Sequence, residues 1–176
     1  HCLKKYKINY FQGSSKNVKK RFLDCSSKLK DKDIIIRLTG DNILVDDKLI
    51  NKCLFFYKKQ NKDYLCFDAR ENNVPYGISV EIFKLKLLRD LKKSSKKINE
   101  HVTSNFKKEF FKINNFFKKK MFNFRSTIDY FEDYISLKKI IENNNLQTDW
   151  KKLCGNIREY KISKNNNFYF KIKKTI

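Results

Sequence analysis

The sequence feature that most constrains the fold is a run of aliphatic residues that ends in a polar turn. Residues 34–38 are three isoleucines, an arginine and a leucine, and Gly40-Asp41-Asn42 follows close behind. A continuous run of β-branched residues predicts a strand that is buried on both faces. The turn places the Asp41 carboxylate just past the carboxyl end of that strand, where ligands bind in open α/β sheets. Taken alone, this stretch does not decide whether Asp41 holds a metal or only ends a strand.

Helical and extended segments alternate around this strand. Before it we expect a short strand at residues 8–11 and a helix over residues 16–30 that Ser15 caps. After it, a second helix starts at Asp46-Asp47, and residues 64–67 form a second apolar strand. The order strand, helix, strand, helix, strand predicts a layered parallel α/β sheet. The apolar stripe expected on the second helix consists of Leu49, Ile50, Cys53, Leu54 and Tyr57.

The second half of the chain is less regular. Residues 78–83 alternate between apolar and polar side chains, which predicts a strand with Glu81 on the face opposite to the isoleucines. The pattern alone favours a solvent-facing position for this glutamate. Residues 121–126 also alternate as a strand, and a helix is predicted over residues 130–141.

The large net positive charge of the chain says little about which partners it binds. Lys and Arg number 41 against 19 Asp and Glu, which gives a formal net charge of +22. Such an excess suggests an anionic partner such as nucleic acid. A nucleic-acid binder, however, concentrates arginine and aromatic residues on one face, whereas these lysines lie along the whole chain. We therefore interpret them as a solvated surface with no specific nucleic-acid partner. A basic α/β module that binds RNA or acidic polysaccharide remains an open alternative.

The cysteines indicate a reducing compartment. Their number is odd, and no two of them form a Cys-x-x-Cys pair. Most of them have apolar neighbours, which favours buried free thiols over disulfides or a zinc site. No stretch is apolar enough to span a membrane, and the amino terminus has no signal peptide, so we expect a cytoplasmic location. The five residues are Cys2, Cys25, Cys53, Cys66 and Cys154.

Two carboxylates follow apolar strands and call for separate interpretation. Asp41 alone is typical of a turn. Asp129 heads a helix with Glu132 three residues on, an arrangement that resembles a capping box. Because each follows a predicted strand, the two could lie at the same sheet edge, where paired carboxylates would suit Mg²⁺. His101 has no partner at a spacing that would make it a general base, and the pattern favours a partly buried histidine near a helix start.

Four segments in order resemble the cytidylyltransferase family that makes CMP-activated sugars, especially its spore-coat-polysaccharide-like branch. The resemblance covers residues 1–142, which we take as part of one such domain, and leaves residues 143–176 as an extension with no assignable role. In that extension we expect a helix and a final strand. The segments are Phe11-Gln12-Gly13-Ser14 with Val18 and Arg21-Phe22; Ile36-Arg37-Leu38-Thr39-Gly40-Asp41-Asn42; Pro75-Tyr76-Gly77-Ile78-Ser79-Val80-Glu81-Ile82-Phe83 followed by Glu100-His101-Val102-Thr103; and Arg125-Ser126-Thr127-Ile128-Asp129 with Glu132-Asp133.

The resemblance implies a fold and a reaction. The implied fold is a three-layer α/β sandwich of the nucleotide-diphospho-sugar-transferase type with a Rossmann-like mixed sheet. The implied reaction transfers CMP from CTP to a sugar acid with Mg²⁺ as cofactor, and a homodimer is compatible with it. The family's paired catalytic metal carboxylates fall on Asp41 and Asp129. The other implied site residues are Arg37, Gly40 and again Asp41 beside the nucleotide, with Glu81 and His101 in the sugar pocket.

Two departures from the family pattern qualify this expectation. Ile43 stands where the family usually carries a proline soon after the Gly-Asp pair. In addition, nothing in the chain matches the opening strand and the Gly/Arg-rich loop that wraps the triphosphate in the family. We therefore expect an enzyme domain that is incomplete at its N-terminus and binds CTP poorly by itself. A glycosyltransferase or another nucleotidyltransferase of the same fold remains an alternative.

Overall fold

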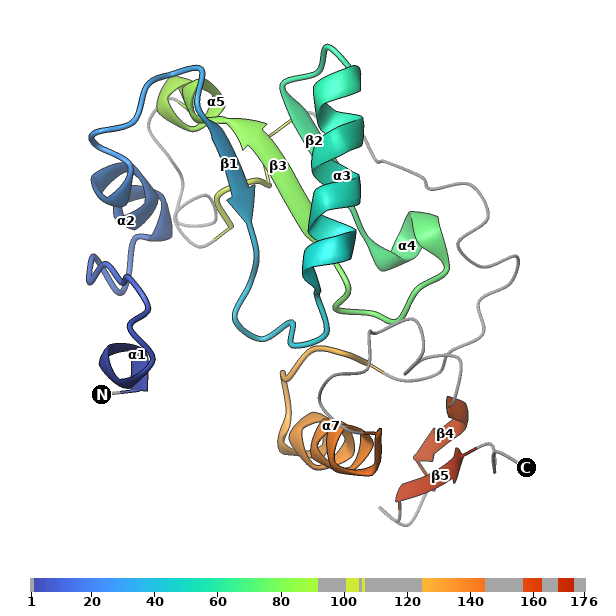
Figure 1. Cartoon of the computed structure of the whole chain (residues 1–176). Helices are drawn as coiled ribbons and strands as arrows, with labels where there is room; N and C mark the ends of the chain where they lie inside the picture. The colour runs from blue at the N-terminus through green and yellow to red at the C-terminus, as the bar shows by residue number, and fades with distance from the viewer. Residues whose placement is uncertain are drawn as a thin grey trace. The chain divides into compact units, whose positions relative to one another are not determined.

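A computed structural model describes residues 2–91, 101–104, 106, 125–144, 157–162 and 168–172 of the chain. The helices and strands alternate at first, and their arrangement is drawn in Figure 1. The elements are α1 (Cys2–Lys5), α2 (Val18–Cys25), β1 (Ile34–Arg37), α3 (Asp47–Lys59), β2 (Tyr64–Phe67), α4 (Ala69–Asn72), β3 (Val80–Lys84), α5 (Leu85–Asp90), α7 (Phe131–Asn144), β4 (Ile157–Ile162) and β5 (Phe168–Ile172).

The chain divides into two compact units. The first unit comprises His1–Ile35 with Phe83–Lys107, and the second comprises Ile36–Ile82 with Lys108–Ile176. The division passes through β1 and β3, so each unit is assembled from segments that are distant in the sequence. The proposed domain boundary after residue 142 lies within α7 and remains a prediction.

Three strands form a sheet in the order β1-β3-β2. β2 and β3 are neighbours, and α4 with a loop connects them. Figure 1 shows the arrow of β3 pointing opposite to that of β1. The all-parallel sheet predicted from the alternation of strands and helices is therefore wrong. The α/β class implied by the family resemblance agrees with the structure, in which β3 runs antiparallel to its neighbours β1 and β2.

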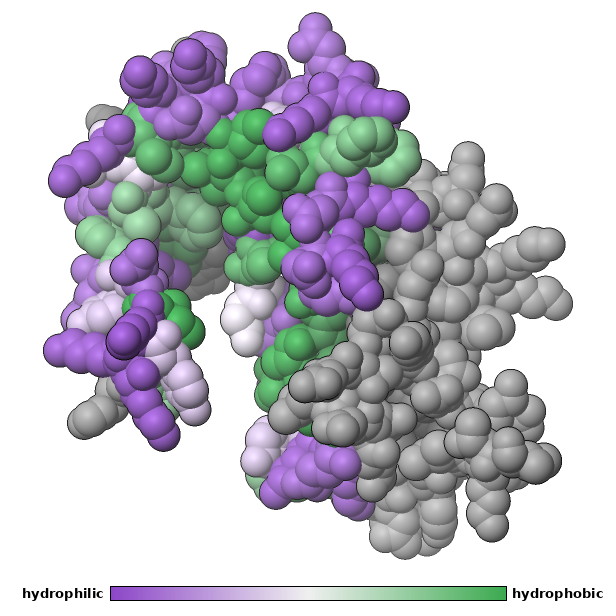
Figure 2. All heavy atoms as spheres, viewed as in Figure 1, coloured by the Kyte–Doolittle hydropathy of each residue, from purple (hydrophilic) through white to green (hydrophobic). Residues whose placement is uncertain are grey.

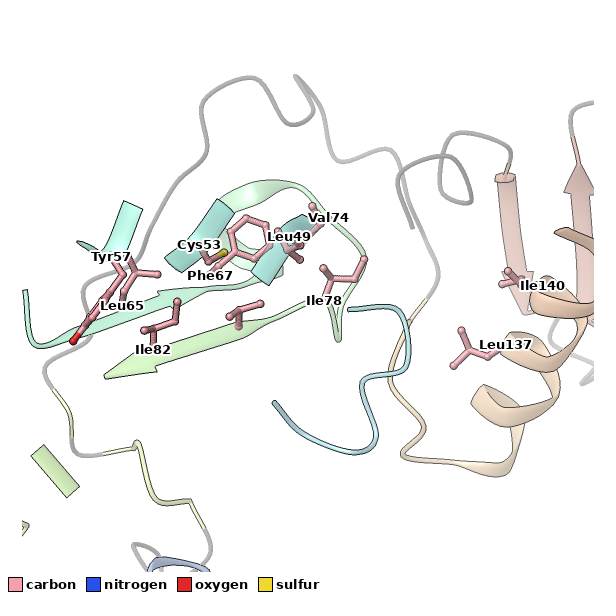
Figure 3. Close-up of a cluster of buried hydrophobic side chains, with 11 residues drawn as sticks. Leu49, Cys53, Tyr57, Leu65, Phe67, Val74, Ile78, Ile82, Leu137 and Ile140 are labelled. Carbon is pink, nitrogen blue, oxygen red and sulfur yellow. The ribbon is translucent and has the colours of Figure 1, made fainter. Parts of the chain in front are cut away.

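Most of the core of the second unit lies between α3 and one face of the sheet, and two residues of α7 also belong to it (Figure 3). Helix α3 begins at Asp46, whose side chain accepts a hydrogen bond of 2.8 Å from the Leu49 amide. The predicted stripe of α3 is confirmed. Three of its residues are buried, and the other two pack against the core from the side. The core side chains are Leu49, Cys53 and Tyr57 of α3; Leu65 and Phe67 of β2; Val80 and Ile82 of β3; Val74 and Ile78; and Leu137 and Ile140 of α7.

Alternation along the strands sends the remaining side chains to the other face. In β2, Leu65 and Phe67 face the core, so Tyr64 and Cys66 lie on the opposite side. Glu81 stands between two core residues of β3 and therefore also lies on that side. This face of the sheet carries the candidate site.

Several predictions for the first 40 residues are wrong. Residues 8–11 form no strand, and no described strand lies beside them to supply hydrogen bonds. Helix α2 is shorter than the predicted 16–30. It starts later because Asn17 rather than Ser15 caps it, with the Asn17 side chain accepting from the Lys20 amide at 2.8 Å, and it ends at Cys25 with Ser26 as the C-cap. β1 is not buried on both faces, since Ile34 and Ile36 are 38% and 36% exposed. Figure 2 shows hydrophobic atoms at the surface where β1 lies.

The predictions for the cysteines and for the tail, residues 143–176, are confirmed in part. Cys53 and Cys66 are buried free thiols as predicted, but Cys2 and Cys25 are exposed, and Cys154 lies outside the described residues. In the tail, β4 and β5 pair antiparallel, which confirms a final strand. The predicted tail helix and most of the predicted strand at 121–126 lie outside the described residues.

Candidate functional site

A cavity of about 380 Å³ opens on the face of the sheet opposite to α3, and all of its lining residues belong to the second unit. Strands β1, β2 and β3, helix α4 and the loops next to them contribute to its wall. Most of the side chains are polar or charged, which suits a hydroxylated or anionic ligand better than an apolar one. The lining residues are Arg37, Thr39, Asp41, Asn42, Cys66, Asp68, Ala69, Tyr76, Gly77, Ile78, Ser79, Glu81, Thr127 and Asp129.

Backbone pairing brings the two candidate metal carboxylates to one wall of the cavity. Asn42 and Thr127 form an isolated antiparallel bridge, and the Ile128 amide donates to the Asp41 carbonyl at 3.0 Å. Asp41 and Asp129 therefore stand close along two paired backbone segments, and both line the cavity. The structure thus brings together these two predicted residues, which are 88 positions apart in the sequence.

The loop that carries Gly77 completes this wall. The Ser126 amide donates to the Tyr76 carbonyl at 2.6 Å, and the Ser126 hydroxyl donates to the same oxygen at 3.1 Å. Gly77 has φ of 99°, a conformation that L-residues with a side chain rarely adopt. A Cβ atom at this position would lie 2.6 Å from the Thr127 amide nitrogen. Only glycine allows this close approach.

The environment of Asp129 differs from the predicted capping box. Asp133, not Asp129, serves the start of α7: its Oδ2 accepts from the amides of Asp129 and Tyr130 at 3.0 and 3.1 Å. The Asp129 carboxylate instead accepts a hydrogen bond from the Arg125 guanidinium and faces the cavity. Arg125 in turn lies over the ring of Tyr76 at 5.0 Å. The prediction that the Asp129 side chain caps the helix is therefore wrong.

The cavity wall offers a small number of carboxylate ligands for a metal ion. Among the residues that the structure describes, no group of three or more His, Cys, Asp or Glu side chains could enclose an ion. Asp41 and Asp129 supply two carboxylates beside a polar cavity. Mg²⁺ is usually bound by one or two carboxylates and completes its octahedron with phosphate oxygens and water. The arrangement therefore fits Mg²⁺ held jointly with a phosphate ligand, and not a closed structural site.

Glu81 lies in a network that crosses the three strands, which we call the cross-strand network: Arg37 of β1, Glu81 of β3 and Tyr64 of β2. Arg37 Nη1 donates to Glu81 Oε2, and the Tyr64 hydroxyl donates to Glu81 Oε1 at 2.6 Å. Only 18% of the Arg37 side chain and 13% of the Glu81 side chain are exposed. The solvent-facing position favoured for Glu81 is therefore wrong. Sequence reasoning missed Tyr64, although a hydroxyl on the non-core side of a buried strand was a usable signal.

Burial keeps two phenols protonated. It raises the pKa of Tyr57 to about 12, and nearby Asp63 adds to the shift. It also raises the pKa of Tyr64, further helped by the negative charges that Cys66 and Glu81 would carry. Both phenols therefore act as hydrogen-bond donors throughout the neutral range. In the unfolded chain they ionise near 10, so they stabilise the fold below that pH, and this contribution is lost as the pH rises further.

We expect Tyr57 and Tyr64 to resist titration in the folded chain. At about pH 11, well above the ordinary tyrosine value, phenolate absorbance should increase when denaturant is added. Tyr57→Phe and Tyr64→Phe should each remove part of that increase. An unchanged absorbance on unfolding would contradict the burial of these hydroxyls.

For two predicted site residues the structure gives no observation that supports the predicted role. His101 is exposed, belongs to the first unit and does not line the cavity. Gly40 is exposed, and a Cβ atom there would meet nothing within 4 Å, so the structure shows no close approach that requires glycine. The assignment of His101 to the sugar and of Gly40 to the nucleotide remains a prediction.

Comparisons with known proteins agree on one family. A family model described as cytidylyltransferase matches residues 2–175, which extends through the tail and past the last recognised motif. The spore coat polysaccharide biosynthesis protein SpsF of Bacillus subtilis is 31% identical over 152 residues, covering 81% of this chain and 60% of that protein. An uncharacterized protein of Methanocaldococcus jannaschii is 38% identical over 98 residues, covering 54% of this chain and 38% of its own length.

A solved structure gives the same result for the fold. The structure of a cytidylyltransferase from Leptospira borgpetersenii matches with a TM-score of 0.72 and 29% identity, covering 87% of this chain and 67% of the other. This confirms the nucleotide-diphospho-sugar-transferase type of α/β fold that the family resemblance implied. The chain spans about four tenths to six tenths of the length of the two curated relatives. Among the described residues, no helix is long and apolar enough to cross a membrane.

Proposed function

The chain belongs to the cytidylyltransferase family, and on that premise we propose that the protein transfers CMP from CTP to a hydroxyl group of a sugar acid and releases pyrophosphate. The likeness to a spore coat polysaccharide biosynthesis protein supports a role in making cell-surface polysaccharide or glycoconjugates. We place the reaction in the cytoplasm, in keeping with the buried free thiols Cys53 and Cys66.

The observation that carries this proposal is the meeting of Asp41 and Asp129 at one cavity wall. These two carboxylates would hold Mg²⁺, which when bound neutralises the triphosphate and polarises the phosphoryl oxygens. In the reaction, the sugar hydroxyl oxygen forms a bond to the α-phosphorus of CTP. The bond from that phosphorus to the pyrophosphate oxygen breaks, and the hydroxyl proton passes to water.

The protein's own contribution is mainly to position the two substrates, because phosphoryl transfer needs little covalent help from side chains. Gly40, at the end of the segment that follows β1, would lie beside the nucleotide. Glu81 would accept a hydrogen bond from the sugar, since its carboxylate lines the cavity. The family resemblance implied that Arg37 lies beside the nucleotide, but because Arg37 pairs with Glu81 we assign it to the sugar end of the cavity.

We expect this chain by itself to release pyrophosphate slowly, because none of its segments matches the Gly/Arg-rich loop that wraps the triphosphate in the family. The measurement is pyrophosphate release with each of the four nucleoside triphosphates, with Mg²⁺ and a panel of sugar acids. It should be made on this chain and on a longer chain that carries the loop.

The longer chain should be the faster of the two and should prefer CTP. Equal rates for the two chains would contradict the need for the loop. Release with another nucleotide, or with a neutral sugar and not a sugar acid, would replace the proposed substrates. No release from the longer chain with any pair would overturn the proposed function.

A further inference from the structure

The cross-strand network joins all three strands of the sheet at the cavity. Because the strand order is β1-β3-β2, Glu81 on the central strand has Arg37 on one side and Tyr64 on the other. Arg37 and Glu81 line the cavity, whereas Tyr64 is buried and does not line it. Tyr64 can therefore influence a ligand through the Glu81 carboxylate that its hydroxyl contacts.

The charges in this network balance. The Arg37 guanidinium is paired with the Glu81 carboxylate, and little of either side chain is exposed. The Glu81 carboxylate neutralises the Arg37 charge, so a phosphate or carboxylate group placed there would gain little net attraction and would also be repelled by Glu81. This part of the cavity is therefore suited to neutral hydroxyl groups and not to the triphosphate.

Neighbouring side chains have the same character. Asn42 Nδ2 donates to the Ser79 hydroxyl at 3.0 Å, and both residues line the cavity together with Thr39. A carboxylate has about four acceptor positions, so Glu81 can accept from a ligand hydroxyl in addition to its protein donors. Charge-assisted hydrogen bonds of this type are about twice as strong as neutral ones and fix the orientation of the ligand.

We propose that Tyr64 is a positioning residue that, together with Arg37, holds the Glu81 carboxylate toward the cavity to bind hydroxyl groups of the sugar acceptor. This inference rests on the proposed function, since it assigns the sugar to this end of the cavity. Tyr64 suits the task because its phenol remains a neutral donor, owing to the pKa increase that burial produces. The triphosphate would lie toward the other end, at Asp41 and Asp129.

The test is Tyr64→Phe in the longer, loop-bearing protein, with the sugar acid that supports the fastest pyrophosphate release. Losing a hydrogen bond to a charged group should raise the KM for that sugar acid roughly tenfold. The KM for CTP should stay within about twofold, because the nucleotide does not contact the network. A general weakening of the fold would not separate the two substrates in this way.

Tyr57→Phe is the matched control. Tyr57 is also buried, and its hydroxyl donates to the Asp63 carbonyl at 3.3 Å, but it faces the core and not the cavity. It should leave both KM values unchanged. Equal sugar KM values in the two variants, or a parallel rise in the KM for CTP in Tyr64→Phe, would overturn the inference.

A second measurement separates this inference from the proposed function. In urea unfolding of the chain, Tyr64→Phe and Glu81→Gln should each change the unfolding equilibrium constant. The change in the double variant should differ roughly tenfold from the product of the two single changes. Independent effects would overturn the network whatever the activity. A coupled pair in a protein that turns over no sugar acid would leave the network standing and would overturn both the proposed function and the sugar-binding role.

Discussion

Replacing Asp41 with asparagine should lower CTP-dependent pyrophosphate release by more than about a hundredfold. Asparagine keeps the size of the side chain but removes the charge that would bind Mg²⁺. The fold should be preserved, because Asp41 is exposed and its structural hydrogen bond uses the backbone carbonyl, which accepts from the Ile128 amide. The measurement is the initial rate as a function of Mg²⁺ concentration in the loop-bearing protein, together with circular dichroism.

Asp129→Asn should lower the rate of pyrophosphate release by a factor of the same order. Asp129 also accepts a hydrogen bond from Arg125, so the substitution changes the contacts of that guanidinium. With 40% of its side chain exposed, this surface pair contributes little to stability. For both variants, excess Mg²⁺ should restore only part of the rate.

The matched control for these variants is Asp90→Asn. Asp90 is an exposed aspartate at the end of α5 that pairs with Lys86 at 3.0 Å, in the first unit and outside the cavity. The Asp90→Asn variant should release pyrophosphate at the rate of the unsubstituted protein. If Asp41→Asn and Asp129→Asn kept the rate of the unsubstituted protein, the metal site would be wrong. Salt-sensitive RNA binding that neither substitution altered would then support the basic binding module.

The parts of the fold that depend on local patterns were predictable from the sequence. The stripe of α3 has a clear helical period, and Asp46 is a strong N-cap residue, so both the start of the helix and its buried face were correct. The meeting of Asp41 and Asp129 could be expected because each follows an apolar strand, and strand ends tend to gather at one sheet edge.

Features that depend on distant partners could not be predicted. Three consecutive isoleucines looked fully buried, but their exposure depends on what lies next to β1, and among the described strands only β3 does. Glu81 looked solvent-facing because the pattern cannot show that Arg37 and Tyr64 stand on either side of it. At the start of α7 the pattern indicated Asp129 as the cap, but it could not show that the Asp129 carboxylate pairs with Arg125 and that Asp133 accepts from the backbone amides instead.

Gly77→Ala should have the largest effect on stability and should also remove activity. The position has a positive φ of 99°, and the new methyl group would lie 2.6 Å from the Thr127 amide nitrogen and 2.8 Å from Ser126 Oγ. The atoms that it meets include backbone, which cannot turn aside as a flexible side chain could. Backbone strain and overpacking together should lower the free energy of unfolding by roughly 2–4 kcal/mol.

The loss of activity follows from the same geometry. The segment displaced by an alanine at position 77 includes Ser126 and Thr127, which lead directly to Asp129. A shift of even about 1 Å in a substrate-positioning group can cost a hundredfold in rate. Gly40→Ala is the control for stability, because a Cβ atom there meets nothing within 4 Å, and it should change the urea midpoint little. If the two alanine variants unfolded at the same urea concentration, the close packing of the Gly77 loop against Ser126 and Thr127 would be refuted, and with it this account of how the cavity wall is held.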